Sequence, residues 1–273
     1  MRIVSIINLK GGVGKTTTAI NMAMILAHLY KKRVLLIDND IQANMTLYFK
    51  MLDYNRDSID SIYRLESVNM DDIIRCTYAY GATCRDYVLD IVPSNMNMDV
   101  SITELLKSES QDQIHRLRNA LNQVSAQYDF CIIDNPPSIG MNVLNALACT
   151  NDIIIPIKLD KSAMDGMEEL YVLAGEMAEF NENISSIKSL VTMFYKSTEM
   201  IAGEMVLHQS QYDVFNTHIR YSRRVDSGSF EQNGKGLLSY SPRSAACIDY
   251  KRFVKEYLSS VPEEAKKEVD YHG

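Results

Sequence analysis

The sequence predicts an α/β fold, a doubly wound and mostly parallel sheet with helices on both faces. Short apolar runs rich in β-branched residues alternate with longer helical patterns along most of the chain. Such alternation favours parallel strands, because each helix carries the chain back to the starting edge of the sheet. A glycine-rich turn also separates the first apolar run from the first helical pattern. The 273 residues, 46% hydrophobic and 23% charged, have the composition of a globular protein.

Each element follows from its local pattern. The apolar runs are too short for buried helices and are the predicted strands: 2–8, 33–37, 87–92, 129–133, 152–157 and 189–194. Helical spacing of apolar residues predicts helices over 15–30, 111–127, 141–150, 162–180, 199–211 and 243–258. Residues 52–82 suggest only short helices and loops. We expect a single domain over 1–260, followed by a polar, disordered tail over 261–273, which has no apolar face.

Composition excludes several classes of protein. No apolar run approaches the ~20 residues of a membrane span, and the first residues lack the apolar stretch of a signal peptide. The five cysteines form no CxxC pair, which favours reduced thiols in the cytoplasm. Net charge is −7, but residues 220–255 contain eight basic and three acidic residues, a local charge of +5. A bulk attraction to nucleic acid is excluded, whereas a local basic patch is not.

The strongest motif is KGGVGKTTT, from Lys10 to Thr18, which follows a strand and opens a helix. Glycines let a loop turn its backbone N–H groups toward phosphate oxygens, and the helix N-terminus adds positive partial charge. Lys15 is placed to reach the β- and γ-phosphates, and the Thr16 hydroxyl to bind Mg²⁺. The motif therefore predicts an ATP and Mg²⁺ site at residues Gly11, Gly12, Val13, Gly14, Lys15, Thr16 and Thr17.

The variant KGGxGK[ST], with its extra lysine, resembles the ParA/MinD family of deviant Walker A ATPases, P-loop NTPases of the SIMIBI type. VLLIDNDIQANMT (34–46) and YDFCIIDNPPS (128–138) resemble the second and third motifs of that family. VFNTHIRYSRR (214–224) and LLSYSPRSAACIDY (237–250) resemble its C-terminal pattern. Ile41 and Arg220 each replace a usual proline, and about two extra residues follow Ile219. The resemblance covers most of the chain and is nearest to short, Soj-like ParA proteins.

Three carboxylates follow predicted strands, and ligands of doubly wound sheets bind at the carboxyl ends of strands. By the resemblance, Asp134 is the Walker B acid that holds Mg²⁺ mostly through water, and Asp38 supports the metal shell. Asp40 orients the attacking water by the same resemblance, so that Lys10, Lys15 and Asp40 form the catalytic set. The alternative for Asp40 is a helix N-cap.

The resemblance also implies a homodimer that encloses two ATP molecules, with Lys10 reaching the partner's phosphates. It places the adenine near 193–195 and 219–221, with Ile219 and Arg220 as the named cofactor contacts. Relatives bind DNA without sequence preference as ATP dimers. The candidate DNA-binding residues are Arg223, Arg224, Lys251, Arg252 and Lys255. The alternative is a solvated face whose arginines pair with Asp226, Glu231 and Asp249.

The implied function is DNA partition by a cytoplasmic, nucleoid-associated ATPase. A ParB-type protein would stimulate its slow, Mg²⁺-dependent hydrolysis and release it from DNA. Two alternatives stay open. A MinD-like membrane switch needs an amphipathic C-terminal helix, of which 250–258 is a faint example, but a net-acidic tail follows it. A positioning ATPase for another cargo, such as conjugation machinery, would use the same chemistry.

Overall fold

The computed structural model describes residues 1–64, 67–77, 88–108, 112–160, 163–225 and 236–262. Within these residues one sheet has seven strands in the order β3-β4-β2-β5-β1-β6-β7. Every neighbouring pair is parallel except β3 with β4, so the predicted mostly parallel sheet is confirmed. The strands are β1 (Arg2–Ile6), β2 (Val34–Asp38), β3 (Arg75–Cys76), β4 (Leu89–Val92), β5 (Phe130–Asp134), β6 (Asp152–Lys158) and β7 (Ser186–Thr192).

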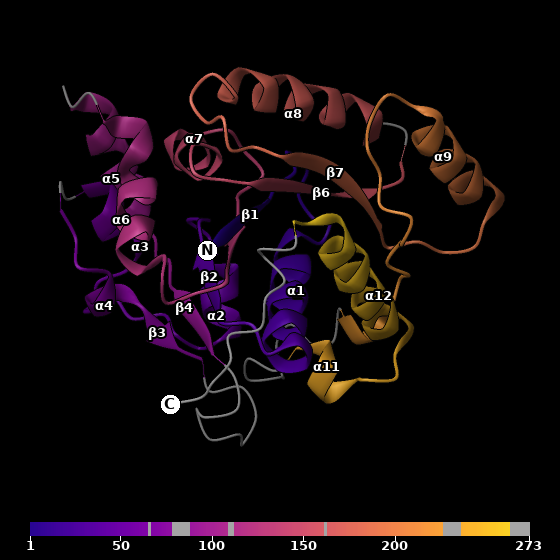
Figure 1. Cartoon of the computed structure of the whole chain (residues 1–273), viewed down its shortest axis with the longest axis horizontal. Helices are drawn as coiled ribbons and strands as arrows, with labels where there is room; N and C mark the ends of the chain where they lie inside the picture. The colour runs from indigo at the N-terminus through magenta and orange to yellow at the C-terminus, as the bar shows by residue number, and fades with distance from the viewer. Residues whose placement is uncertain (65–66, 78–87, 109–111, 161–162, 226–235, 263–273) are drawn as a thin grey trace.

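Helices cover both faces of this sheet (Figure 1). The helices α1 (Lys15–Tyr30), α11 (Leu237–Tyr240) and α12 (Ala245–Ser260) pack on one face. The other face carries α3 (Ile59–Arg64), α5 (Asn97–Lys107), α6 (Arg116–Val124), α7 (Met141–Leu147) and α8 (Ala163–Met177). The remaining described helices are α2 (Asn44–Tyr48), α4 (Met70–Ile73), α9 (Thr198–Gln209) and the 3₁₀ turn Gln113–His115.

The strand β2 shows why the sheet needs two helical layers. Val34 and Leu36 point into the cluster with α1 and α12, whereas Leu35 and Ile37 point into the cluster with α3 and α6. All four side chains are fully buried. A strand that is apolar on both faces is stable only when both faces are covered, which is the usual state of parallel sheets.

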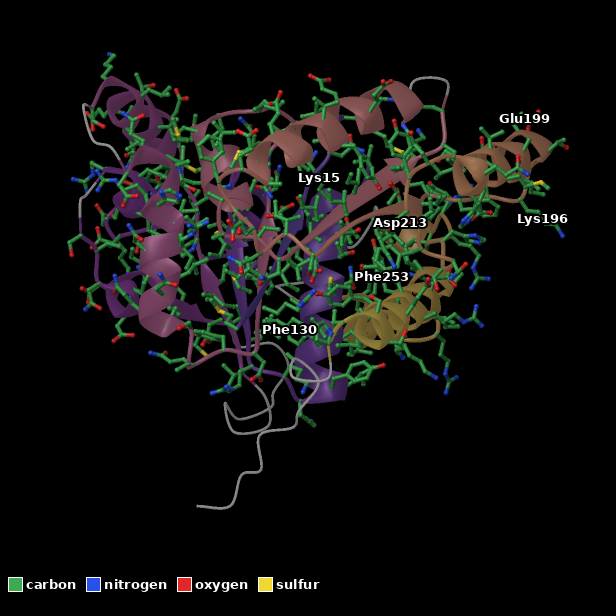
Figure 2. The ribbon with its side chains drawn as sticks, turned by 45° about the horizontal axis from the view of Figure 1, so that its top comes forward. Lys15, Phe130, Lys196, Glu199, Asp213 and Phe253 are labelled. Carbon is green, nitrogen blue, oxygen red and sulfur yellow. The ribbon has the colours of Figure 1, made fainter. Side chains whose placement is uncertain are left out.

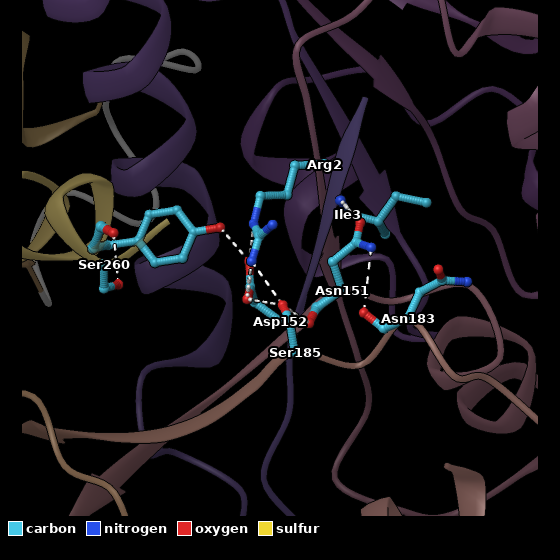
Figure 3. A network of polar contacts seen from close by, with 8 residues as sticks. Arg2, Ile3, Asn151, Asp152, Asn183, Ser185 and Ser260 are labelled. Atoms are coloured by element: carbon cyan, nitrogen blue, oxygen red, sulfur yellow. Dashed lines mark hydrogen bonds and ion pairs between the residues drawn. The ribbon is translucent and has the colours of Figure 1, made fainter. Parts of the chain in front are cut away.

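A polar network anchors the first strand (Figure 3). Arg2 forms a two-pronged ion pair with Asp152 of β6, with nitrogen–oxygen distances of 2.5 and 2.7 Å. The same guanidinium donates to Ser185 at 2.8 Å, and the Tyr257 hydroxyl of α12 donates to Asp152 at 2.6 Å. Because the buried carboxylate accepts hydrogen bonds from both β1 and α12, the network fixes these two elements relative to β6.

Several elements differ from the sequence-based expectations. The helix expected over 111–127 is α6, which starts only at Arg116, and α5 was not predicted. In α5 the buried Met98, Ser101 and Leu105 lie on one face, and the serine interrupts the apolar pattern. Val261, expected in the tail, is 4% exposed and packs against the α1–α12 cluster. The rest of the predicted tail, from residue 263 on, lies outside the described residues.

Candidate nucleotide site

The glycine loop joins β1 to α1 and has the backbone that the motif predicts. Gly12 and Gly14 have φ angles of 72° and 88°, in the left-handed region where any other residue would be strained. Val13 between them is buried, and its carbonyl accepts a 2.8 Å hydrogen bond from the Thr192 hydroxyl of β7. The loop is therefore attached to the sheet at its middle as well as at its ends.

Lys15 lies at the start of α1, inside the fold (Figure 2). Only 8% of the residue is exposed, and its Nζ donates to the carbonyl of Lys10 at 2.9 Å. Burial lowers the pKa of Lys15, while the charges of Asp134 and Asp40 oppose that change. The Lys15 side chain thus crosses the loop, and its ammonium lies near both carboxylates. This is the position that phosphate binding requires.

Asp38 and Asp134 are register neighbours at the ends of β2 and β5. Asp38 is fully buried and accepts hydrogen bonds from the backbone N–H of Thr46 at 2.8 Å and its hydroxyl at 2.6 Å. Burial raises the pKa of Asp38 to about 6, although these donors favour its ionised form. Thr46 closes the second motif, VLLIDNDIQANMT, but that pattern does not show that its side chain binds Asp38.

The carboxylate of Asp134 is buried and strongly favours its protonated form. Burial and the neighbouring Asp38 raise the pKa of Asp134 well above its usual range, while a hydrogen bond from Thr16 opposes that rise. Its Oδ1 is buried without a hydrogen-bond partner among the described residues. A buried carboxylate oxygen with no donor requires either a proton or a cation.

The residues present fit Mg²⁺, a hard cation that prefers oxygen ligands. Asp134 offers an unpaired carboxylate oxygen, and the Thr16 hydroxyl lies beside it. The described part of the chain contains no group of three or more His, Cys, Asp or Glu side chains arranged to hold a metal. A magnesium ion would therefore complete its shell with phosphate oxygens and water, as it usually does at phosphate sites.

Asp40 caps a turn, and the expectation that it is a helix N-cap is wrong. Its Oδ1 accepts from the N–H of Gln42 at 2.9 Å, whereas α2 begins at Asn44 after Ala43 in the left-handed region. Ile41 in place of proline leaves this turn intact. Asp40 is as buried as Lys15, with 8% of the residue exposed.

Lys10, the extra lysine of the motif, is turned away from its own loop. Its Nζ lies 2.7 Å from Oδ1 of Asp160, just past β6. Its backbone N–H is held by Asn8 at 2.9 Å. The structure thus places Lys10 beside the site without placing its ammonium in it.

A small slot opens beside Gly14 and Thr17, where the adenine contacts were expected. It brings together the predicted Met193, Ile219, Arg220 and Tyr221, and adds Thr192, Ser222, Val225 and Tyr250. Thr192 and Ser222 adjoin the predicted ranges, and Tyr250 is the last residue of the second C-terminal motif. Ile219 is buried in the core, and the Arg220 guanidinium pairs with Asp249 of α12 at 2.7 and 2.8 Å.

The expected DNA-binding residues lie just after the slot residues in the chain or on α12. Arg223 and Arg224 are exposed; on α12, Arg252 and Lys255 are exposed and Lys251 is half-buried. Asp249 pairs with Arg220 and lies 3.7 Å from Arg252, so the alternative of internal ion pairs holds for Arg220. Asp226 and Glu231, also offered as partners, lie outside the described residues.

A larger, strongly polar cleft of about 410 Å³ lies elsewhere, among residues of 54–75 and 95–97. The first residue of α5, Asn97, and a first-turn residue of α3, Asp60, line this cleft, but its lining includes no residue of a glycine loop. We therefore assign the nucleotide site by the chemistry of the phosphate loop and not by the size of the cleft. In the described residues we found no helix with the length and apolarity of a membrane span.

Comparison with known proteins agrees with this geometry. A family model described as an AAA domain matches residues 1–186. The sporulation initiation inhibitor protein Soj of Bacillus subtilis is 31% identical over 95% of this chain and 99% of its own length. The chromosome partitioning protein ParA of Myxococcus xanthus is 32% identical over 98% of this chain and 92% of its own length.

Among solved structures, a plasmid partition protein of Borrelia burgdorferi bound to AMPPNP superposes with a TM-score of 0.78. It is 24% identical over 95% of this chain and 99% of its own, a likeness that supports the fold alone. The two bacterial partition proteins match almost the whole chain at more than 30% identity. The chain therefore belongs to the ParA/Soj family of partition ATPases.

Proposed function

We propose that this protein binds ATP and Mg²⁺, hydrolyses ATP slowly, and uses the cycle to partition DNA. The observation that carries the proposal is the meeting of three features at one edge of the sheet. These are the glycine loop with left-handed Gly12 and Gly14, the buried Lys15, and the paired strand ends at Asp38 and Asp134. Phosphoryl transfer needs mainly positioning and charge neutralisation, which this set supplies.

The proposed roles follow the geometry. Backbone N–H groups from Gly11 to Thr17 and the Lys15 ammonium bind the phosphates. Thr16 and Asp134 hold Mg²⁺, with Asp38 supporting its shell. The cation, when bound, neutralises charge that develops on the phosphate oxygens. Asp40 orients the attacking water. We expect a slow basal rate because a single carboxylate positions that water.

The proposed switch is dimerisation. Two chains would enclose two ATP molecules face to face, and Lys10 of each would leave Asp160 for the phosphates held by the other chain. The candidate DNA-binding residues, from Arg223 to Lys255, would then form one basic patch on each chain. Two linked patches bind DNA phosphates more tightly than one, because the second binds at a high effective concentration. A ParB-type protein would stimulate hydrolysis and release, which gives a cytoplasmic protein found on the nucleoid.

The test uses the Asp40→Ala variant, which should bind ATP without hydrolysing it. We expect it to form a dimer and to bind non-specific duplex DNA with Mg²⁺ and ATP but not with ADP. Binding should weaken steeply between two salt concentrations, because it depends on phosphate contacts. Normal hydrolysis by the variant would contradict the role of Asp40. A dimer without DNA binding in either nucleotide would contradict the DNA switch.

A further inference from the structure

A buried pair of amides joins the two loops that carry the site carboxylates. Nδ2 of Asn39 donates to Oδ1 of Asn135 at 2.8 Å. The residues are 0% and 1% exposed, so water does not compete for the bond. Asn39 follows β2 and Asn135 follows β5. The bond therefore connects two neighbouring strand ends just beyond the last sheet hydrogen bonds.

Two further side chains complete the network. The Tyr63 hydroxyl of α3 donates to Oδ1 of Asn39 at 2.7 Å. Asn142 of α7 donates from Nδ2 to the carbonyl of Asn39 at 2.9 Å, and its own carbonyl accepts from Asn39 at 3.0 Å. Every polar group of the Asn39 side chain thus has a partner. A fully satisfied buried network specifies one arrangement and resists others.

The position of the pair in the chain gives it a function. Asn39 lies between Asp38 and Asp40, and its N–H donates to the carbonyl of Asp134 at 2.9 Å. Asn135 directly follows Asp134, and its N–H donates to the carbonyl of Ile6 at 3.1 Å, at the start of the phosphate loop. Each asparagine is therefore one peptide away from a site carboxylate. A rotation of either loop would move a carboxylate relative to the phosphates.

We propose that Asn39 and Asn135 are positioning residues that fix the carboxylate of Asp40 relative to that of Asp134. Tyr63 of α3 orients the Asn39 side chain through its hydrogen bond. This inference rests on the proposed ATP hydrolysis. Neither amide touches the reacting atoms. Both act through their neighbours in the chain. Displacement of a catalytic group by about 1 Å costs on the order of 100-fold in rate, so a bond that sets this spacing affects turnover more than nucleotide binding.

The experiment compares Asn39→Ala, Asn135→Ala and the double variant with the wild type. We expect each single change to lower kcat by about 10- to 100-fold, with the KM for ATP changing less than about threefold. The double variant should be no slower than the slower single one, because both changes break the same bond. Tyr63→Phe, which removes one hydroxyl, should give a smaller loss and serves if an alanine variant does not fold.

The matched control is Asn181→Ala. Asn181 is also a buried asparagine, 2% exposed, whose Nδ2 donates to two backbone carbonyls at 2.8 and 2.7 Å, far from the phosphate loop. It should lower the urea midpoint without lowering kcat. The inference is overturned if the site variants lose stability alone, if their kcat losses are independent and multiply, or if kcat and nucleotide affinity fall together.

A second readout separates this inference from the proposed function. We would measure the Mg²⁺ concentration for half-maximal binding of a non-hydrolysable ATP analogue. It should rise several-fold in Asn39→Ala and stay constant in Asn181→Ala, whether or not the wild type hydrolyses ATP. Absence of hydrolysis in the wild type contradicts the proposed function. An unchanged Mg²⁺ requirement in Asn39→Ala contradicts the inference.

Discussion

The ammonium of Lys10 lies 2.7 Å from the carboxylate of Asp160, so the motif's extra lysine is paired within its own chain. The two side chains are 27% and 46% exposed, and an ion pair so open to water stabilises by at most about 1 kcal/mol. The pair thus holds Lys10 in a defined place at little energetic cost. Any partner site that takes up Lys10 must first break it.

Replacement of Asp160 should therefore strengthen dimerisation. In an Asp40→Ala background with ATP and Mg²⁺, we expect Asp160→Asn to tighten the dimer about 5- to 30-fold, since about 0.5–1 kcal/mol of competition is removed in each of the two chains. Analytical ultracentrifugation measures the change. Asp112→Asn, which removes an exposed carboxylate paired with His115, is the control. Equal dimer affinity in both variants would exclude a role for Lys10 release.

Lys15→Ala should abolish tight nucleotide binding. The loss of its charge-assisted bonds to phosphate should weaken ATP by roughly 100-fold or more. Calorimetric titration with the non-hydrolysable analogue provides the measurement. Lys32→Ala is the matched control, because Lys32 is also buried, 5% exposed, but lies beyond the far end of α1. Nucleotide affinity equal to the wild type would contradict the phosphate-loop assignment.

Arg223→Ala with Arg224→Ala should weaken DNA binding about tenfold or more and flatten its salt dependence by about one unit of slope per lost phosphate contact. The measurement is fluorescence anisotropy with duplex DNA at several salt concentrations. The control removes the same charge from two exposed arginines by the polar cleft, Arg56→Ala with Arg64→Ala. If both pairs of changes act alike, bulk charge rather than this patch attracts DNA.

The stability of the metal-free protein should depend on Asp38. Burial raises the pKa of Asp38 from 3.8 to about 6, so between these values the folded protein holds a proton that the unfolded chain releases. The free energy of unfolding therefore falls as pH rises from about 4 to 6. Asp38→Asn should make this fall shallower and gain up to about 3 kcal/mol over the wild type above pH 6, while Asp134, whose pKa is also raised, keeps its own part of the fall. Urea unfolding with a chelator measures both proteins. A difference between them that is constant with pH would contradict the assignment.

Much of the fold is readable from the sequence, because a short, β-branched apolar run such as VLLI favours a strand that is covered on both faces. The glycine loop and the carboxylates that follow β2 and β5 are equally readable, since motif and strand end coincide. The two-residue edge strand β3 was missed because so short a segment carries no periodicity. This strand pairs with β4 in the antiparallel direction.

The side-chain partners could not be predicted in the same way. Asn39 and Asn135 meet because β2 and β5 are adjacent in register, although 96 residues separate them in the chain. The pairing of Arg220 with Asp249 likewise depends on how α12 packs on α1. Sequence patterns identify which residues carry charge, whereas the sheet order decides which of them become neighbours.

The place of β1 in the sheet has a consequence for biosynthesis. This strand is synthesised before both of its partners, because it lies between β5 and β6 and pairs with Phe130–Asp134 and with residues from Asp152 on. At ~5–20 residues per second, roughly 6 to 26 s pass between synthesis of the strand and of its first partner. During this interval the apolar segment RIVSI has no sheet to join. The apolar strand β1 is therefore a segment that chaperone protection would serve until β5 has been synthesised.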